Sequence, residues 1–181
     1  EWILKDMLLD ENIILIGEAG TGKNTLERYL AHLLNYNILI AGMSGETKVS
    51  DLQTYRSFGE EEAGKTGDTA TLVLGALTDT QQDWLVVLDE ANKAQSGVLV
   101  SFNDLLQDKV LRLLDTKELA ITGKVFVNMN PNRPPYEVND ISFEFMDRFC
   151  IHTINHLPKD QAVEVSHNKY TGADDDFVQD V

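Results

Sequence analysis

The sequence lacks several features that would place it in a specialised class of protein. Its 181 residues include one cysteine, Cys150, so they cannot form an internal disulfide framework, and this scarcity fits a reducing cytosol. No apolar run approaches the 18 residues that a membrane helix requires, and the chain does not open with a basic region, an apolar stretch and a cleavage site. We therefore predict a cytoplasmic protein that does not cross a membrane.

Basic residues are scarce as well. Lysine and arginine total 15 against 30 aspartates and glutamates, which gives a net charge of −15 at pH 7. Proteins that bind nucleic acid without sequence preference gain most of their affinity from lysines and arginines on phosphates, and here no basic cluster offsets the acidic excess. A nucleic-acid partner is therefore not expected. The apolar fraction of 43% argues against disorder throughout and is enough for the core of one domain.

Short apolar runs alternate with patterns of helical periodicity along the chain. We expect strands at 12–16, 37–41, 84–88, 125–127 and 149–154. We expect helices at 2–8, 23–34, 49–52, 69–77 and 98–106, and a hairpin between 110 and 121. The rest of the polar, glycine-rich stretch 44–68 is expected to be loop. Continuous apolar strands that alternate with helices predict an α/β fold with a five-stranded, mostly parallel sheet between helices.

A glycine-rich segment between the first strand and the following helix carries the strongest functional signal. The sequence Gly-Glu-Ala-Gly-Thr-Gly-Lys, residues 17–23, has the pattern of a loop that binds phosphate. Its glycines let successive backbone amides converge on phosphate oxygens, the helix N-terminus adds a favourable potential, and Lys23 adds a full positive charge. The residues expected to bind the nucleotide are Gly17, Glu18, Ala19, Gly20, Thr21, Gly22, Lys23, Asn24 and Thr25.

One position in this segment departs from the usual pattern. A serine or threonine normally follows the lysine and supplies a hydroxyl to Mg²⁺, but here that residue is Asn24. An asparagine oxygen also suits a hard cation, directly or through water, so Asn24 is a candidate metal ligand. Thr25 is a poor replacement because the next helical residue is rotated by about 100°. In the alternative interpretation, Asn24 only begins the helix and contacts no metal.

Two carboxylates at the end of a later apolar strand give a second signal. Asp89 and Glu90 follow the strand at 84–88, and in folds of this kind such a strand end meets the phosphate loop. Asp89 is expected to hold Mg²⁺ through its water shell, and Glu90 to orient and polarise the water that attacks the γ-phosphate. The spacing from Lys23, with another helix and strand between, makes this pattern more specific than an acidic strand end alone.

Four motifs in a fixed order resemble the core of the AAA+ ATPases. They are the phosphate loop, the segment Asp-Glu-Ala-Asn-Lys-Ala at 89–94, the run Asn-Met-Asn-Pro at 128–131 and Phe-Met-Asp-Arg-Phe at 145–149. The order is similar to that of the MoxR-like and dynein- or midasin-related branch, and the resemblance covers about residues 12–158. It implies a P-loop fold in which residues 1–157 form the α/β nucleotide-binding domain. Residues 158–181 are then the start of a truncated helical lid or an acidic tail.

The resemblance also implies roles for three polar residues. Asn130 matches the sensor residue that contacts the γ-phosphate or the attacking water, with Asn128 as a nearby competitor for that role. The alternative for each asparagine is a cap at the end of the strand. Arg148 matches the arginine finger that reaches the nucleotide of a neighbouring subunit, where a guanidinium suits the charge on the transferring phosphoryl group. The alternative for Arg148 is an ion pair with Asp147 or Glu144.

On this resemblance we expect ATP and Mg²⁺ as cofactors, and a homo-oligomer, a hexameric ring, that hydrolyses ATP to remodel a protein partner. The segments 56–68 and 108–122 resemble insertions that act on such partners; the alternative is plain surface loops. An alternative function is an ATP-gated interaction module with little or no hydrolysis, which the asparagine at position 24 favours. A P-loop kinase is disfavoured by Asn130 and Arg148 in family order. The chain starts without methionine and is expected to be a fragment.

Overall fold

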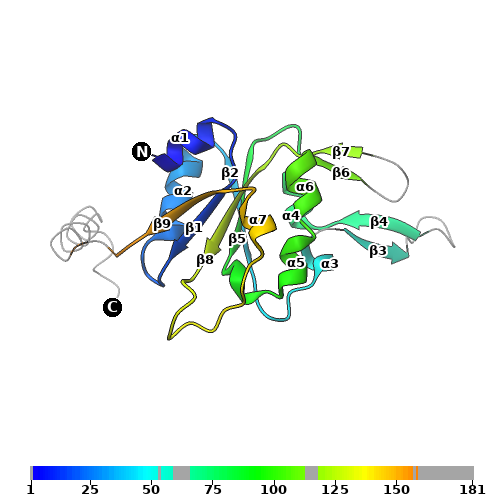
Figure 1. The fold of residues 1–181 in the computed structure, drawn as a ribbon. Coiled ribbons are helices and arrows are strands. Elements are labelled where there is room, and N and C mark those ends of the chain that lie inside the picture. Colours follow the sequence, from blue (N-terminus) through cyan, green and yellow to red (C-terminus); the bar gives the residue numbers. More distant parts are fainter. Residues whose placement is uncertain (1, 53, 59–65, 113–117, 157, 159–181) are drawn as a thin grey trace, which may run out of the picture.

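A five-stranded parallel sheet forms the centre of the molecule in the computed structural model, which describes residues 2–52, 54–58, 66–112, 118–156 and 158 (Figure 1). Its strands are β1 (Ile13–Gly17), β2 (Asn37–Gly42), β5 (Trp84–Asp89), β8 (Lys124–Met129) and β9 (Cys150–Ile154). The strand order across the sheet is β2-β5-β8-β1-β9, and every neighbouring pair is parallel. The five predicted strands and the parallel sheet are confirmed.

The three inner strands, β1, β5 and β8, appear in the sequence as continuous apolar runs and not as alternating apolar and polar residues. In β1, β5 and β8 nearly every side chain is buried, because helices cover both faces of the sheet. Val127 of β8 pairs with Ile14 on one side and with Leu88 on the other. This shared register brings the carboxyl ends of β1, β5 and β8 together at one edge of the sheet, where the predicted site residues follow.

Helices and core clusters differ between the two faces of the sheet. On one face α1 (Trp2–Leu8) and α2 (Lys23–Leu33) pack through a cluster that includes Met7, Leu30 and Phe126. On the other face a larger cluster includes Leu77, Leu99, Phe102 and Phe145. Its helices are α3 (Val49–Leu52), α4 (Leu72–Leu77), α5 (Ser96–Val100), α6 (Asn103–Asp108) and α7 (Phe143–Met146), and a short 3₁₀ helix, η1 (Ala91–Lys93), follows β5.

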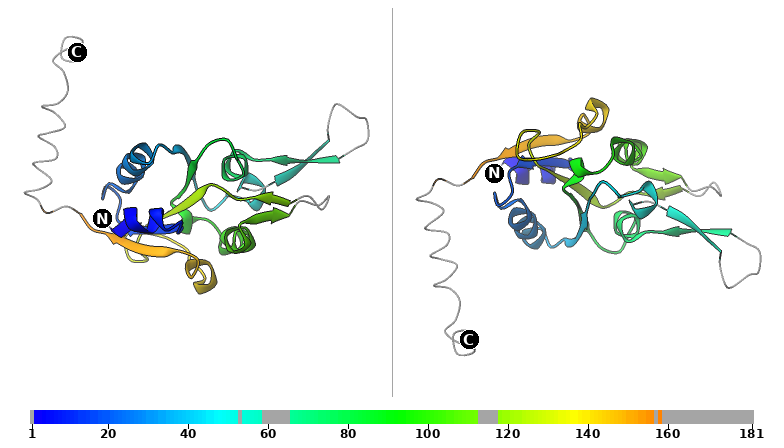
Figure 2. Two further views of the ribbon diagram at one scale, coloured as in Figure 1. Left: turned by 90° about the horizontal axis from the view of Figure 1, so that it is seen from above. Right: turned by 90° about the horizontal axis from the view of Figure 1, so that it is seen from below.

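Two antiparallel hairpins project from the end of the domain opposite the end of β9 (Figure 2). The first joins β3 (Thr54–Phe58) to β4 (Thr66–Ala70), and the second joins β6 (Val110–Arg112) to β7 (Glu118–Ala120). The predicted hairpin at 110–121 is confirmed. The prediction of loop is wrong for residues 54–58 and 66–68, which form these paired strands although no apolar alternation marks them in the sequence. Residues 59–65 and 113–117 lie outside the described parts of the chain.

Two helix predictions need correction, and one helix was missed. The helix expected at 69–77 begins only at Leu72, because Thr71 caps it by accepting a hydrogen bond from the Leu74 amide at 3.3 Å. The helix expected at 98–106 is two short helices, α5 and α6. The α7 helix was not predicted. A helix is also expected after Pro158; apart from Pro158 itself, this helix and the predicted lid or tail at 158–181 lie outside the described residues. In the part of the chain that is described, no helix has the length and hydrophobicity needed to span a membrane.

Candidate functional site

The phosphate-binding segment forms the connection between β1 and α2. Gly20 and Gly22 have φ angles of +80° and +87°, in the left-handed region that favours glycine. At Gly17 the restriction is space, because a Cβ there would lie 2.6 Å from the carbonyl oxygen of Ile154 at the end of β9. The three glycines therefore let the chain turn sharply against the sheet, as the sequence pattern predicts.

Lys23 begins α2 and is nearly buried, with 9% of its surface exposed. Its Nζ donates hydrogen bonds to the carbonyl oxygens of Gly17 at 2.6 Å and Glu18 at 3.0 Å. Burial lowers the pKa of the Lys23 amine, and nearby carboxylates oppose this, with the largest opposing effect from Asp89. The ammonium group is thus held against the start of the loop, and Lys23 also lines the pocket described below.

Asn24, Asp89 and Asn128 meet at the carboxyl edge of the sheet. The Nδ2 of Asn24 donates to Oδ2 of Asp89 at 3.1 Å. The Nδ2 of Asn128 donates both to Oδ1 of Asn24 at 3.0 Å and to Oδ1 of Asp89 at 3.1 Å. Three elements far apart in the sequence, α2, β5 and β8, therefore place amide and carboxylate oxygens together, which are the donors that Mg²⁺ prefers.

The oxygens of Asp89 and Asn24 fit a cation whose other ligands are water molecules and phosphate oxygens. No group of three or more histidine, cysteine, aspartate or glutamate side chains able to hold a metal ion occurs among the described residues. A bound Mg²⁺ usually keeps several waters and binds through one or two carboxylates together with substrate phosphates. Asp89 with Asn24 matches that pattern and not the pattern of a cation enclosed by protein ligands alone.

Asn128 and Asn130 sit differently from one another. The side chain of Asn128 is fully buried within the site, as described above. The main chain of Asn130 pairs with the side chain of Asn92, which donates to its carbonyl oxygen at 2.7 Å and accepts from its amide at 3.3 Å. Both asparagines line the same pocket. Of the two asparagines, Asn128 is thus the one whose side chain contacts Asn24 and Asp89. It therefore does more than cap the end of the strand.

Glu90 follows β5 in an uncommon backbone conformation. Its φ of +55° lies in the left-handed region, which is rare outside glycine, asparagine and aspartate and often occurs at functional sites. Its amide donates to Oδ1 of Asp89 at 3.1 Å, and its carboxylate accepts from Lys93 at 2.7 Å. The carboxylate is about half exposed, with 45% of its side-chain surface open. It therefore lies beside Asp89 and remains accessible to water.

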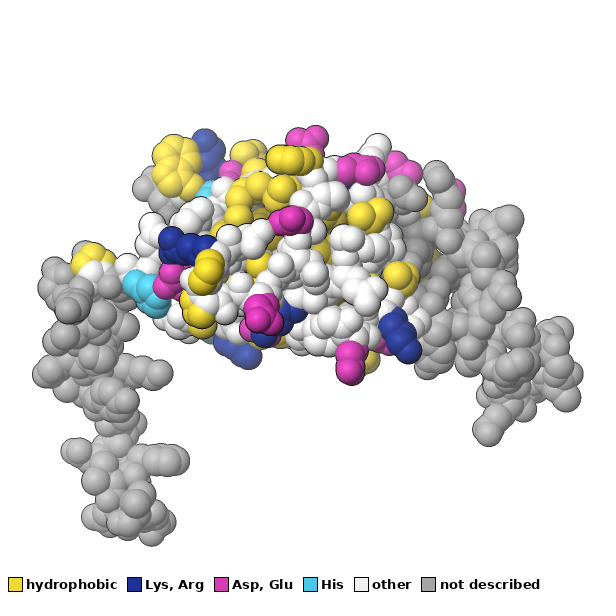
Figure 3. Space-filling view, turned by 60° about the horizontal axis from the view of Figure 1, so that its bottom comes forward, with side chains coloured by type: hydrophobic (Ala, Val, Ile, Leu, Met, Phe, Trp, Pro, Cys, Tyr) yellow, Lys and Arg dark blue, Asp and Glu magenta, His cyan; other side chains and the backbone are white. Residues whose placement is uncertain are grey.

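An open pocket of about 280 Å³ collects most of the predicted residues. Its lining is formed by residues 19–25 of the phosphate loop, Asp89 and Glu90 after β5, and residues 128–130 after β8. Gly17 and Glu18 contribute carbonyl oxygens to Lys23 instead of lining the pocket. Figure 3 shows that, on the face it presents, acidic, basic and hydrophobic side chains of the described residues are interspersed, without a basic patch.

Arg148 lies outside this pocket and contacts its own chain. It follows α7, and its guanidinium donates to the carbonyl oxygen of Glu144 and to Oε1 of Gln107, the latter at 2.7 Å. A carboxylate oxygen of Glu144 lies 3.7 Å from Nη2. The ion pair that was the alternative interpretation is therefore present. The expected finger role concerns a neighbouring subunit, so it remains a prediction.

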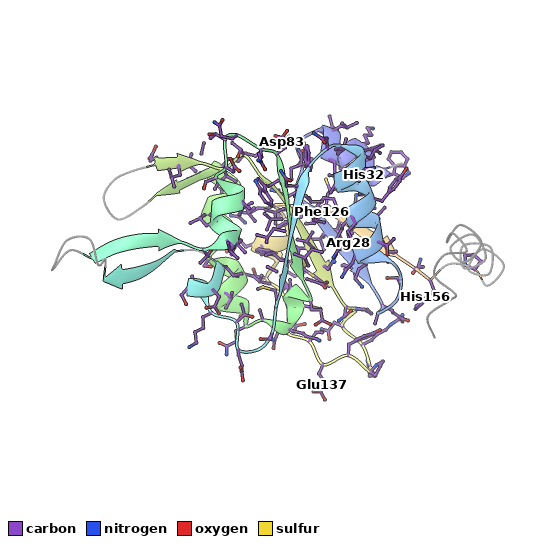
Figure 4. All side chains as sticks on the ribbon, turned by 180° about the vertical axis from the view of Figure 1, so that it is seen from behind. Arg28, His32, Asp83, Phe126, Glu137 and His156 are labelled. Atoms are coloured by element: carbon purple, nitrogen blue, oxygen red, sulfur yellow. The ribbon has the colours of Figure 1, made fainter. Side chains whose placement is uncertain are left out.

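Several contacts on the phosphate loop were not foreseen. The hydroxyl of Tyr136 accepts from the Ala19 amide at 3.0 Å. The carboxylate of Glu18 accepts from Arg133 at 2.5 Å and contacts the His156 ring at 3.1 Å, and these two bonds, the Arg133 bond first, lower the pKa of Glu18. Figure 4 labels His156, which follows the end of β9. The sequence offers no signal for these contacts, because residues 133 and 136 lie more than a hundred positions from the loop.

Known proteins resemble this chain in both sequence and fold. Mouse von Willebrand factor A domain-containing protein 8 is 27% identical over 190 aligned positions, which cover 96% of the chain and 10% of that protein. Midasin from Giardia intestinalis is 27% identical over 154 positions, which cover 81% of the chain and 3% of midasin. Midasin from Dictyostelium discoideum is equally identical over 158 positions. The chain thus spans a tenth or less of the length of these relatives.

A solved structure and a family profile agree with this similarity. The structure, of a candidate ATPase from Cytophaga hutchinsonii, matches with a TM-score of 0.70 at 16% identity, over 95% of the chain and 50% of the other protein, and so supports the fold. The profile of the AAA domain, dynein-related subfamily, matches residues 12–149, which hold the phosphate loop, both carboxylates and Arg148. This chain therefore belongs to the dynein-related subfamily of AAA domains.

Proposed function

We propose that this domain binds ATP with Mg²⁺ and hydrolyses it, and that turnover drives the remodelling of a protein partner by a ring of copies. The observation that carries the proposal is the meeting of Lys23, Asn24, Asp89 and Glu90 around one pocket. Membership of the AAA family supports a nucleotide-binding function of this general kind. The partner is proposed to be protein.

The phosphate groups are assigned to the loop and the start of α2. Residues 20–25 offer backbone amides, and α2, with 11 residues, adds the positive potential of its N-terminus. Lys23 would exchange its bonds to the carbonyl oxygens of Gly17 and Glu18 for phosphate oxygens, which carry a full negative charge. This exchange favours a triphosphate over a neutral ligand.

Asp89 and Asn24 are the residues that would hold Mg²⁺. When bound, the cation neutralises charge on the phosphate oxygens as the phosphoryl group transfers. Asp89 supplies a full negative charge and Asn24 a neutral oxygen, so the pair has less charge than two carboxylates. We therefore expect the metal to be held mainly together with the nucleotide, not by the protein alone.

Glu90 is assigned to the attacking water. Its accessible carboxylate can accept a hydrogen bond from water and take up a proton as the oxygen attacks the γ-phosphorus, while the bond from that phosphorus to the bridging oxygen breaks and ADP leaves. Asn130 or Asn128 would contact the γ-phosphate or that water, since both line the pocket. Arg148 is proposed to act on the nucleotide of a neighbouring copy after releasing Glu144 and Gln107.

A second candidate function is an ATP-gated interaction module with little hydrolysis. The contact that favours it is the bond from the Asn24 amide to Asp89, which occupies a carboxylate oxygen that a metal-bound water would otherwise use. An Asn24→Thr variant distinguishes the two candidates. A large gain in turnover would favour the module, because it would show that asparagine impairs the natural site.

The direct test is Mg²⁺-dependent ATP hydrolysis measured over a wide range of protein concentration, with Lys23→Ala as the inactive control. Specific activity that rises with concentration supports sites completed between copies. Tight ATP binding with negligible turnover at every concentration supports the gated module. Absence of ATP binding in the parent chain contradicts both candidates.

A further inference from the structure

The face of α2 that packs on the sheet carries a carboxyl group where an apolar side chain is expected. The buried residues of this helix are Lys23, Glu27, Leu30 and Ala31, which recur at helical spacing. Glu27 has no exposed surface (0%). A buried carboxyl group is costly unless it is hydrogen-bonded or neutral, so this residue calls for a polar partner.

Glu27 and Asn128 have complementary unpaired atoms. Both carboxyl oxygens of Glu27 and the Oδ1 of Asn128 are buried and lack a hydrogen-bond partner in the described part of the molecule. The Nδ2 of Asn128 has two hydrogens, and both are directed to acceptors, on Asn24 and Asp89. The amide oxygen of Asn128 therefore still needs a donor.

The surroundings of Glu27 favour its neutral, donating form. Burial, followed by the charge of Asp89, raises the pKa of Glu27 to about 8; the Asn128 amide and then the charges of Lys23 and Arg28 oppose this more weakly. Asn128 and Phe126 are two residues apart along β8 and so share the strand face that packs toward α2. Figure 4 labels Phe126 on this face and the exposed Arg28 on α2. Glu27 and Asn128 thus lie in one buried layer.

We propose that Glu27 is a positioning residue, which as a neutral acid donates its hydroxyl hydrogen to Oδ1 of Asn128 and so holds the Asn128 amide toward Asn24 and Asp89. An ionised Glu27 would only accept hydrogen bonds, and it would compete for the same Nδ2 hydrogens. The neutral acid therefore determines which way the Asn128 amide points.

The expected effect of Glu27 on Mg²⁺ binding rests on the proposed function. With the Asn128 amide held in place, Asn24 and Asp89 keep the spacing in which their oxygens suit Mg²⁺ beside a nucleotide. Removal of a residue that hydrogen-bonds and orients metal ligands typically lowers metal affinity by about 10- to 100-fold. Glu27 is thus expected to affect the Mg²⁺ dependence of nucleotide binding more than binding without metal.

Two variants of Glu27 separate positioning from packing. Glu27→Gln keeps the shape and can still donate a hydrogen to Asn128, whereas Glu27→Leu fills the site without any polar group. In protein without nucleotide, the ¹⁵N-labelled side-chain amide signals of Asn128, assigned by their loss in Asn128→Leu, should stay near the parent position in Glu27→Gln and shift in Glu27→Leu. Glu27→Leu removes one buried polar group but leaves Oδ1 of Asn128 without a donor, so its unfolding temperature is measured first to find conditions in which the variant is folded.

The second readout is the affinity for a fluorescent ATP analogue, mant-ATP, with and without Mg²⁺. Glu27→Leu should need about 10- to 100-fold more Mg²⁺ for half-saturation, with little change in affinity without metal, while Glu27→Gln should resemble the parent. In an Asn128→Ala background the two variants should no longer differ, because Glu27 acts through Asn128. If Glu27→Leu unfolds, Glu27→Met serves in its place.

Unchanged Asn128 signals together with unchanged Mg²⁺ dependence in Glu27→Leu would overturn the proposal. A difference between the two Glu27 variants that persists without Asn128 would also overturn it. If the parent binds no mant-ATP, the proposed function fails, but the Asn128 signals still decide whether Glu27 orients this amide.

Discussion

The two faces of the central sheet come from alternate residues of the same strands, yet they differ in chemistry. Toward the helices α4–α7, Val86 and Leu88 of β5 and Val127 of β8 contribute to an apolar cluster. Toward α2, the same strands are apolar only until their carboxyl ends, where Asp89 and Asn128 point into the polar site. One face therefore contributes apolar packing, and the end of the other face carries the polar residues to which we assign the proposed nucleotide site.

This contrast predicts that substitutions on the two sides affect different measurements. Substitutions in the apolar cluster should change the free energy of unfolding and leave the ligand groups in place. Substitutions at the polar end should change nucleotide turnover or metal dependence with little loss of stability. The following experiments test this separation.

The largest effect is expected from Glu90→Gln at the polar end. Loss of a general base typically costs about 10²- to 10⁴-fold in rate, so turnover should nearly stop while ATP stays bound. The unfolding temperature should change little, because the side chain is about half exposed. Hydrolysis assays and nucleotide retention on gel filtration measure this. The matched control is Glu137→Gln, which changes an exposed glutamate outside the pocket and should keep the parent activity. Retained turnover in Glu90→Gln would remove Glu90 from the mechanism.

Phe102→Ala should have the opposite effect: it should lower the free energy of unfolding and leave nucleotide binding unchanged. Phe102 is 1% exposed in the cluster on the α4–α7 face, and truncation of a buried phenylalanine typically costs about 3–5 kcal/mol of unfolding free energy. Urea titration measures the loss, and the affinity for mant-ATP should be retained under conditions where the variant is folded. Phe143→Ala is the control, because that ring is 87% exposed. Equal losses in both variants would contradict the assigned core.

Glu27→Gln should alter how stability depends on pH. The pKa of Glu27 is about 8 in the folded chain and near the ordinary value of 4.5 when unfolded. Between these values the folded state keeps a proton that the unfolded state has lost, so this group lowers stability as pH rises. The parent should lose up to about 1.4 kcal/mol per pH unit relative to Glu27→Gln over this window. Urea titrations at pH 5, 6, 7 and 8 measure the difference, and a constant difference would exclude the raised pKa.

The smallest effect is expected from Thr71→Ala at the start of α4. Loss of the Oγ1 that accepts from the Leu74 amide should cost about 1 kcal/mol of unfolding free energy. Thr71→Ser retains the hydroxyl and should restore most of this stability. Nucleotide binding should be the same in all three proteins, and a change in it would show that the two faces are coupled.

Much of the sheet and of the phosphate pocket could be predicted from the sequence. The inner strands are buried on both faces, so they appear as unbroken apolar runs, and the glycines of the phosphate loop are tied to backbone angles and close contacts. The carboxylates after β5 follow from the same topology, since parallel strands end at one edge of the sheet. These features depend on local sequence and on a common fold.

The features that were not predicted depend on contacts between residues far apart in the sequence or on polar strands without an apolar pattern. The β3–β4 hairpin escaped prediction because its residues are polar and pair outside the core. On the helix at 23–33, Glu27 looks like an ordinary exposed acid, and its burial becomes evident only when Asn128, a hundred residues later, lies in the same layer. The bond from Tyr136 to the phosphate loop is equally remote in sequence.

The carboxylate of Glu18 has a mechanical consequence. It fastens three separate stretches of chain at one point: the phosphate loop itself, the β8–α7 connection through Arg133, and the exit from β9 through His156. The contacts are exposed, so they can break and re-form at little cost. A displacement of the phosphate loop relative to His156 must therefore stretch or break the contact at Glu18.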